Sequence, residues 1–285
     1  MDKLAANGLG ALAVRASGSV VYVADGVKGL QRYDISVATT PVKTAEVATA
    51  GTARGLALLE DFIIVADDDS GVRIFQNSRS GLGEVASLTV SGQAMGVAVS
   101  GARIYAAAGS GGVRVIQIND GLVLSDIGGV PTKDFCWGCD VSGGRLYSAN
   151  DGSGVDIIDV TSSSPRLLNS IRIGGEVFGV AAINEDMCLV CNGRAGICVV
   201  DAHDSRNPTI VSRLASLGET RNARIHGDKG YVAAGFGGVA VVDLSDLRFP
   251  TVLKVIPNRN FAWEADSCGA YVYIADGSSG LIVGE

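Results

Sequence analysis

Residues 20–36 read VVYVADGVKGLQRYDIS, which is two short apolar runs separated by a turn of glycine, small and acidic residues. The same pattern returns six more times along the 285-residue chain. Its most regular position is the glycine that opens the second apolar run, and successive glycines lie 41 or 42 residues apart: Gly29, Gly71, Gly112, Gly154, Gly196, Gly238 and Gly280. A fixed period near 40–50 residues with four short strands per unit is typical of β-propeller blades.

Each repeat predicts four strands, which we call A to D. In the third repeat we expect them at residues 95–100, 103–108, 112–118 and 122–127. The sequence therefore predicts an all-β fold, a seven-bladed β-propeller of four-stranded blades, as a single domain over residues 1–285 whose blades are centred on the seven glycines. The last repeat ends with its third strand, whereas residues 2–7 precede the first A strand, expected at residues 10–14. We expect residues 2–7 to supply the outer strand of the last blade and so to close the ring, because an open ring would expose two sheet edges.

Composition and charge exclude several classes of function. The net charge of −7 and the lack of clustered Lys and Arg argue against nucleic-acid binding. No run of about 18 apolar residues predicts a membrane span, and no secretory signal is recognisable. Six cysteines at spacings that give no facing pair favour free thiols and hence the cytoplasm. The alternative is an exported protein whose signal has been removed, and the oligomeric state is left open.

Two repeat motifs carry a family resemblance. The second strands read YVAD at residues 22–25 and YIAD at residues 273–276, and the third strands read VDIID, ICVVD and VAVVD at residues 155–159, 197–201 and 239–243. The chain thus resembles the LVIVD-repeat propellers, which are related in pattern to the YVTN-type propellers. The resemblance implies a binding or scaffolding module and assigns no catalytic residue.

The candidate site follows from how the blades are arranged. In an A-B-C-D meander the D–A and B–C connections share one end of the ring, and the first residues of the seven A strands converge there on the axis. These residues are Leu12, Arg54, Met95, Trp137, Phe178, Arg221 and Trp263. The next position is glycine in four blades but Asn222 and Glu264 in the last two. Aromatic walls with a few converging polar groups are typical of small-molecule sites.

We therefore predict one ligand pocket at the axial mouth. Its candidate catalytic residues are Glu264 as an acid or base, with Arg221 and Arg54. Its candidate ligand-binding residues are Trp137, Trp263, Phe178, Asn222, Met95, Glu219, Glu176, Phe135 and Phe261. The alternatives are that the aromatic residues only pack between blades and that the channel holds only water.

Two classes of function remain open at this point. The first is a binding or scaffolding protein that takes a small-molecule ligand in the axial pocket. The second is an enzyme that performs lyase, isomerase or hydratase chemistry on a small, partly apolar, anionic substrate. We expect neither a metal nor a cofactor, since His203 and His226 fall on turns at the opposite end and no phosphate-binding loop precedes a helix.

Overall fold

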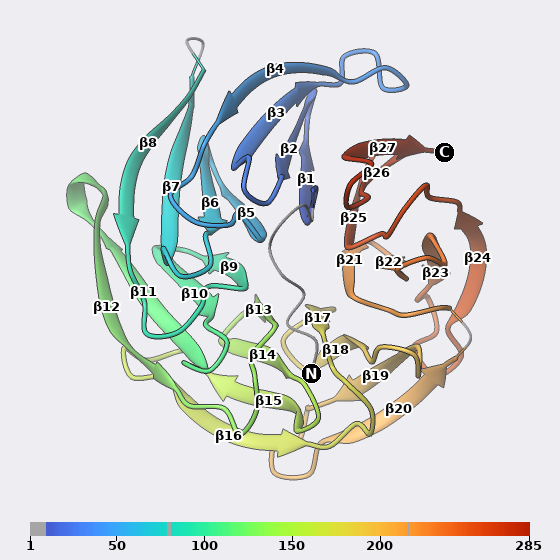
Figure 1. Ribbon diagram of the computed structural model, residues 1–285. Helices are drawn as coiled ribbons and strands as arrows, with labels where there is room; N and C mark the ends of the chain where they lie inside the picture. The colour runs from blue at the N-terminus through green and yellow to red at the C-terminus, as the bar shows by residue number, and fades with distance from the viewer. Residues whose placement is uncertain (1–9, 79–80, 216) are drawn as a thin grey trace.

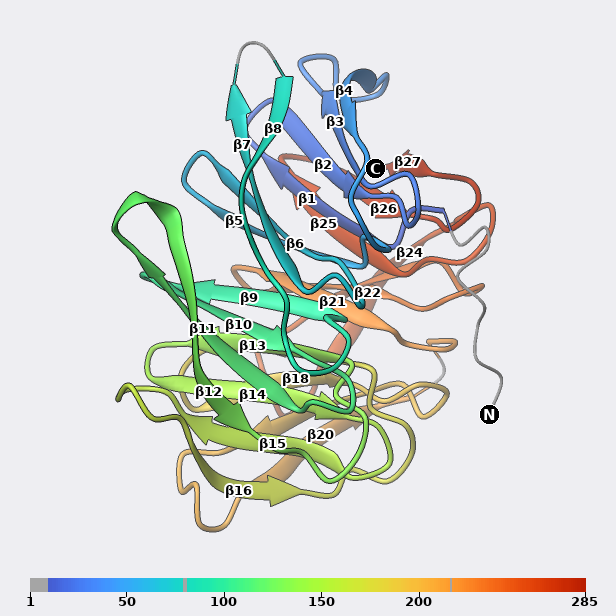
Figure 2. The same cartoon turned by 60° about the vertical axis from the view of Figure 1, so that its left-hand side comes forward.

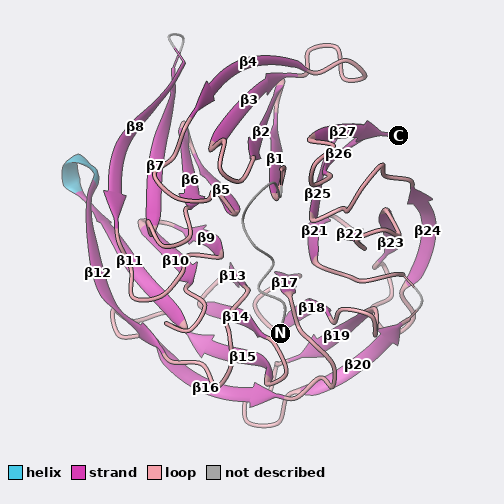
Figure 3. Ribbon diagram, viewed as in Figure 1, coloured by secondary structure: helices cyan, strands magenta, loops and turns pink. Residues whose placement is uncertain are grey.

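The chain folds into a ring of seven antiparallel sheets around a central channel (Figure 1). The computed structural model describes residues 10–78, 81–215 and 217–285. Nearly all of the regular structure is strand (Figure 3), and each sheet runs outward from the axis in chain order. The predicted seven-bladed, all-β propeller is confirmed.

The strands fall into four concentric sets. The innermost strands are β1 (Ala13–Ser17), β5 (Gly55–Leu59), β9 (Gly96–Ser100), β13 (Gly138–Ser142), β17 (Gly179–Ala182), β21 (Asn222–His226) and β25 (Glu264–Cys268). The second strands are β2 (Val20–Ala24), β6 (Phe62–Ala66), β10 (Arg103–Ala107), β14 (Arg145–Asn150), β18 (Met187–Cys191), β22 (Lys229–Ala233) and β26 (Tyr271–Ala275). The third strands are β3 (Leu30–Asp34), β7 (Val72–Ser78), β11 (Val113–Asn119), β15 (Gly154–Asp159), β19 (Ile197–Asp201), β23 (Val239–Asp243) and β27 (Leu281–Gly284). The outer strands are β4 (Val42–Val47), β8 (Gly81–Leu88), β12 (Val123–Val130), β16 (Arg166–Ile171), β20 (Thr209–Leu214) and β24 (Thr251–Ile256).

The strand boundaries expected from the sequence agree with most of the observed ones. In the third blade, β9, β10 and β11 lie within one residue of prediction, while β12 ends three residues later than expected. The first inner strand, β1, begins three residues later than predicted because Ala11 bonds instead to Gly277 of the last blade. One three-residue helical turn, η1 (Asp120–Leu122), joins β11 to β12, and no helix in the described ranges is long enough to cross a membrane.

The repeated glycine has a steric cause. Gly196, for example, has φ +86°, and a Cβ added there would lie 2.2 Å from the carbonyl oxygen of Leu214 on the outer strand. Five other repeats place their glycine equally close to an outer-strand carbonyl. Only glycine adopts this conformation without strain and leaves room for the neighbouring backbone. The spacing of about 42 residues between these glycines therefore marks the start of the third strand in each blade, where six of them pack against the outer strand.

A second repeated contact joins each blade to the next. A turn residue with positive φ between the second and third strands pairs its backbone with the residue two places before the next inner strand. The pairs are Gly26–Ala53, Asp68–Ala94, Gly109–Cys136, Asp151–Val177, Gly193–Thr220, Gly235–Ala262 and Gly277–Ala11. The seventh pair links the last blade to the first, so the ring closes with the same contact that joins every other pair.

The core lies between the blades. Each interface is filled by alternating apolar side chains of two neighbouring sheets, such as Val14, Val21 and Val23 of blade 1 against Tyr273 and Ala275 of blade 7. A repeated bulge between the third and outer strands, present in six blades, increases the twist that Figure 2 shows. The sheet of the last blade, β25-β26-β27, has three strands in the described ranges. The fourth strand that we predict at residues 2–7 lies outside the described residues.

Candidate functional site

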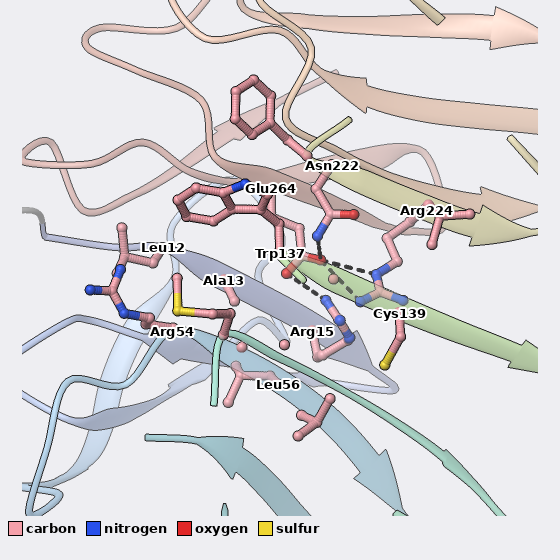
Figure 4. A pocket seen from close by; sticks show the side chains of 17 residues that line it. Leu12, Ala13, Arg15, Arg54, Leu56, Trp137, Cys139, Asn222, Arg224 and Glu264 are labelled. Carbon is pink, nitrogen blue, oxygen red and sulfur yellow. Dashed lines mark hydrogen bonds and ion pairs between the residues drawn. The ribbon is translucent and has the colours of Figure 1, made fainter. Parts of the chain in front are cut away.

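The inner strands enclose a small cavity on the axis (Figure 4). Four inner strands have glycine at the position that faces the axis, which lets the backbones approach closely: the Cα atom of Gly96 lies 3.0 Å from where a Cβ of Gly55 would be. The cavity encloses about 60 Å³. Of the predicted site residues, those that line it are Arg54, Met95, Trp137, Phe178, Asn222 and Glu264.

Glu264 is the most buried charged group of this cavity, with 1% of the residue exposed. Its Oε2 atom accepts from Arg15 Nη1 at 2.6 Å and from the Val14 backbone N–H at 3.1 Å. Its Oε1 atom accepts from Asn222 Nδ2 at 2.8 Å and from Arg224 Nη2 at 3.0 Å and Nε at 3.1 Å. In Figure 4 these three side chains converge on the carboxylate from blades 1 and 6. Glu264 therefore ties together the inner strands of three consecutive blades.

The acid–base properties of Glu264 follow from this environment. Burial raises the pKa of Glu264, and the adjacent Arg15 guanidinium opposes that effect. Both carboxylate oxygens already accept hydrogen bonds from protein donors. Its lone pairs therefore point at protein donors rather than at the open part of the cavity, which suits a positioning role better than proton transfer.

A second layer of polar groups lies two residues further along the inner strands. Asp266 accepts from the Ala16 backbone N–H at 2.9 Å and bonds His226 Nε2 at 2.6 Å. Asp140 accepts from the Ala182 backbone N–H at 2.9 Å, and burial raises its pKa to about 6. These carboxylates satisfy N–H groups on the neighbouring inner strand, which has no strand partner on its axial side.

The two predicted arginines both have carboxylate partners. Arg54 donates from Nε to Asp68 at 2.7 Å. Its side chain lines the cavity at the left of Figure 4, away from the dashed contacts of Glu264. Arg221 pairs with Glu219, and burial lowers the pKa of its guanidinium. Neither arginine is left without a counter-charge, although only Arg54 lines the cavity.

The remaining predicted residues form a ladder of rings beside the cavity. The guanidinium carbon of Arg221 lies 4.0 Å from the centre of the Phe178 ring, 5.2 Å from Trp263 and 5.3 Å from Phe261. The ladder continues from Phe178 through Trp137 to Phe135 at centroid distances of 5.8 and 4.5 Å. Arg221, Trp263, Phe261, Phe135, Glu219 and the exposed Glu176 lie outside the cavity lining. The residues predicted to form one pocket thus belong to two adjoining features, the cavity and the ladder of rings.

Sequence reasoning missed Arg15 and Arg224, the two cations that hold Glu264. Both lie two residues after the first residue of their inner strands, β1 and β21, where three other blades have alanine: Ala57, Ala98 and Ala181. The same alignment of repeats, carried two positions further, would have found them together with Asp140 and Asp266. In the described ranges, no group of three or more His, Cys, Asp or Glu side chains is arranged to hold a metal ion.

The repeats themselves match a known family model. The model described as LVIVD repeat matches residues 10–49, 50–75, 217–254 and 265–283. The chain carries LVIVD repeats. The resemblance noted from the YVAD and VAVVD motifs is confirmed, while residues 76–216 lie outside the matched LVIVD segments. No curated protein sequence matches the chain.

Three solved structures resemble the fold of this chain at low sequence identity. The WD40 repeats of RRP9 give a TM-score of 0.77 at 12% identity, over 94% of this chain and 88% of that one. A chain of the mitotic checkpoint complex gives 0.77 at 14% identity, over 95% and 86%. The computationally designed Ika8 protein gives 0.70 at 13% identity, over 94% and 81%. At such identities the likeness shows the fold alone.

Proposed function

We propose that this propeller is a binding protein whose axial cavity takes a small carboxylate anion. The propeller fold and the LVIVD repeats are consistent with a ligand-binding or scaffolding role. The proposal that the ligand is a carboxylate rests on the charge of the cavity lining. Three guanidinium groups, from Arg15, Arg54 and Arg224, line it against the single carboxylate of Glu264. Arg15 and Arg224 share the single carboxylate of Glu264, and Arg54 pairs with Asp68, so these five groups leave one positive charge in excess for an anion.

The size and walls of the cavity narrow the ligand further. A volume of about 60 Å³ has room for roughly four to six water-sized groups. Trp137, Phe178 and Met95 supply apolar wall, while Arg54 supplies a donor at the rim. A short-chain carboxylate, with a charged head and a small apolar tail, fits both features. Binding is favoured over acid–base catalysis because both oxygens of Glu264 are already engaged.

Thermal unfolding with acetate, propionate or pyruvate, each compared with its neutral amide, tests this proposal. A ligand at about 100 times its Kd stabilises the folded state by about 2.7 kcal/mol. We expect carboxylates to raise the Tm of the parent protein and Arg54→Met to lose most of that rise.

The matched control is Arg73→Met. Arg73 pairs with Asp67 through Nε at 2.7 Å, as Arg54 does with Asp68, but it does not line the cavity. Equal shifts from carboxylates and amides, or equal loss of binding in the two variants, would refute the proposed anion site.

A further inference from the structure

A second cavity lies away from the axis, between blades 1 and 2. It encloses about 160 Å³ and is bounded by the turn between β5 and β6, the start of β2 and the end of β7. Its apolar walls are Val20, Leu58, Phe62 and Ile63, and its polar lining is Ser17, Tyr22, Glu60, Asp61 and Asn77. The first two blades lie side by side in Figures 1 and 2.

In two other blades an arginine fills the groove that corresponds to this cavity, between the start of the second strand and the next blade. Arg145, the first residue of β14, donates from Nη1 to the Ala202 carbonyl at 2.6 Å and pairs with Asp186 at 3.1 Å, both on the next blade. Arg103, the first residue of β10, reaches the Val160 and Ser162 carbonyls of its next blade at 2.9 and 2.7 Å. The grooves from blade 3 to blade 4 and from blade 4 to blade 5 therefore each hold a guanidinium group.

Blade 1 has valine at this position. Val20 is the first residue of β2 and faces Ser17 in the hairpin, just as Arg103 faces Ser100 and Arg145 faces Ser142. A valine side chain ends two bonds from the backbone and reaches none of the acceptors on blade 2. In the described ranges, the groove that arginine occupies elsewhere is left as the 160 Å³ cavity.

The acceptors that bind Arg145 have counterparts on blade 2. Asp61 precedes β6 as Asp186 precedes β18, and the Asn77 backbone N–H donates to the Asp61 carbonyl at 3.0 Å as Ala202 does to Asp186 at 2.7 Å. The Asp61 carboxylate and the Asn77 carbonyl thus match the acceptor pair of Arg145. The carboxylates of Asp61 and Glu60 form no hydrogen bond or ion pair with any described residue, so their charge is available.

Neighbouring groups leave this acceptor pair open. Arg32 donates to the Asn77 side-chain oxygen at 2.6 Å and the Ser78 carbonyl at 3.1 Å, but it does not line the cavity. Glu60 adds a second carboxylate from a turn position with φ +51°, where five other blades have glycine. Phe62 and Tyr22 provide flat walls against which a planar cation can lie.

We propose that the cavity between blades 1 and 2 binds a guanidinium group. The group is supplied either by a free guanidino compound or by an arginine side chain of a peptide. This site is separate from the axial cavity and shares no lining residue with it. The chain's own Arg145 shows the geometry that the incoming group takes.

Titration calorimetry of the full chain with methylguanidinium and with neutral methylurea tests the proposal. We expect saturable binding of methylguanidinium and at least about tenfold weaker binding of methylurea, since charge-assisted hydrogen bonds are lost. Asp61→Asn is expected to weaken methylguanidinium binding by about tenfold or more. Asp228→Asn, which changes the equivalent residue of blade 6, is the matched control and should leave binding unchanged.

Val20→Arg provides an independent arm. The new side chain should fill the groove as Arg145 does, raise the Tm and abolish methylguanidinium binding. N-acetylarginine amide distinguishes the source of the group: tighter binding than methylguanidinium indicates a peptide, and equal or weaker binding indicates a free compound. No saturable binding to the parent chain, equal binding of methylurea, or unchanged binding in Val20→Arg would overturn the proposal.

Discussion

Replacing Glu264 by glutamine removes the one carboxylate that pairs with two arginines, the buried Arg15 and the partly buried Arg224. Glutamine keeps the shape of the side chain, but its single oxygen replaces only one of the two acceptors, so its NH2 group faces donors on the other side. Arg15 and Arg224, which now pair with Glu264 at 2.6 and 3.0 Å, both lose the carboxylate that they share. We expect Glu264→Gln to be strongly destabilising.

The exposure of the partners sets the size of the loss. Removing one partner of a buried ion pair costs about 3–5 kcal/mol. Arg15 has 10% of its side chain exposed and Arg224 24%, so water partly solvates the second cation. We therefore expect about 3 kcal/mol, the lower end of that range. For a chain of this size that corresponds to a fall in Tm of roughly 5 °C.

Thermal unfolding followed by circular dichroism measures this difference. The matched control is Glu46→Gln, which breaks the pair with Lys43 at 2.6 Å where the two side chains are 41% and 47% exposed. Exposed pairs contribute about 0–1 kcal/mol, so the control should stay within roughly 2 °C of the parent. A Glu264→Gln protein that melts with the control would refute the idea that this carboxylate joins three blades.

Three further predictions address the ring, the channel and the ladder. Gly196→Ala should destabilise the fold by more than the roughly 1–2 kcal/mol of a positive φ, because the new Cβ meets the Leu214 carbonyl. If residues 2–7 pair with β27 as predicted, Gly280→Ala should cost as much free energy in urea unfolding. A clearly smaller cost would contradict that pairing. The pKa of Asp140 is raised to about 6, so the folded state binds this proton more tightly and the unfolding free energy falls as pH rises from about 4 to 6. Between pH 4 and pH 7.5 the unfolding free energy of Asp140→Asn should therefore rise relative to that of the parent by at most about 3 kcal/mol. A difference between the two proteins that does not change with pH would disprove the raised pKa of Asp140. Arg221→Lys should lower the unfolding free energy by about 1–2 kcal/mol through lost contacts with the rings, and it should alter Trp263 fluorescence. The control is Arg194→Lys: the Arg194 side chain is 90% exposed and lies 3.8 Å from the same Glu219. This control should change neither stability nor fluorescence.

Much of the fold was predictable because its signals are local. Six of the seven marker glycines are required by the same close contact with an outer-strand carbonyl, so their spacing reports the blade repeat directly. The axial position of Trp137, Phe178, Asn222 and Glu264 followed from aligning the repeats, since equal blades place equal positions at equal radii. The start of β1 was predicted three residues too early, because Ala11 pairs with Gly277 of the last blade at the contact between blades and the strand begins two residues later.

The pairing within the site was not predictable in the same way. The sequence suggested Glu264 as an acid or base because it stands where other blades have glycine. Its partners Arg15 and Arg224 come from different blades, and only the closed ring shows that both guanidinium groups reach the same carboxylate. Likewise, Arg221 was grouped with the cavity, but its side chain stacks on Phe178 beside it.

The amino-acid sequence alone determined the number of blades, the order of strands within each and the residues that point toward the axis, because these depend on periodicity and turn geometry. The ring itself decided which charges neutralise one another and where space is left over. The cavity between blades 1 and 2 illustrates the difference. Val20 is an ordinary strand residue in the sequence. Only the ring shows that its short side chain faces a groove of the kind that Arg145 fills elsewhere, and that a cavity remains there.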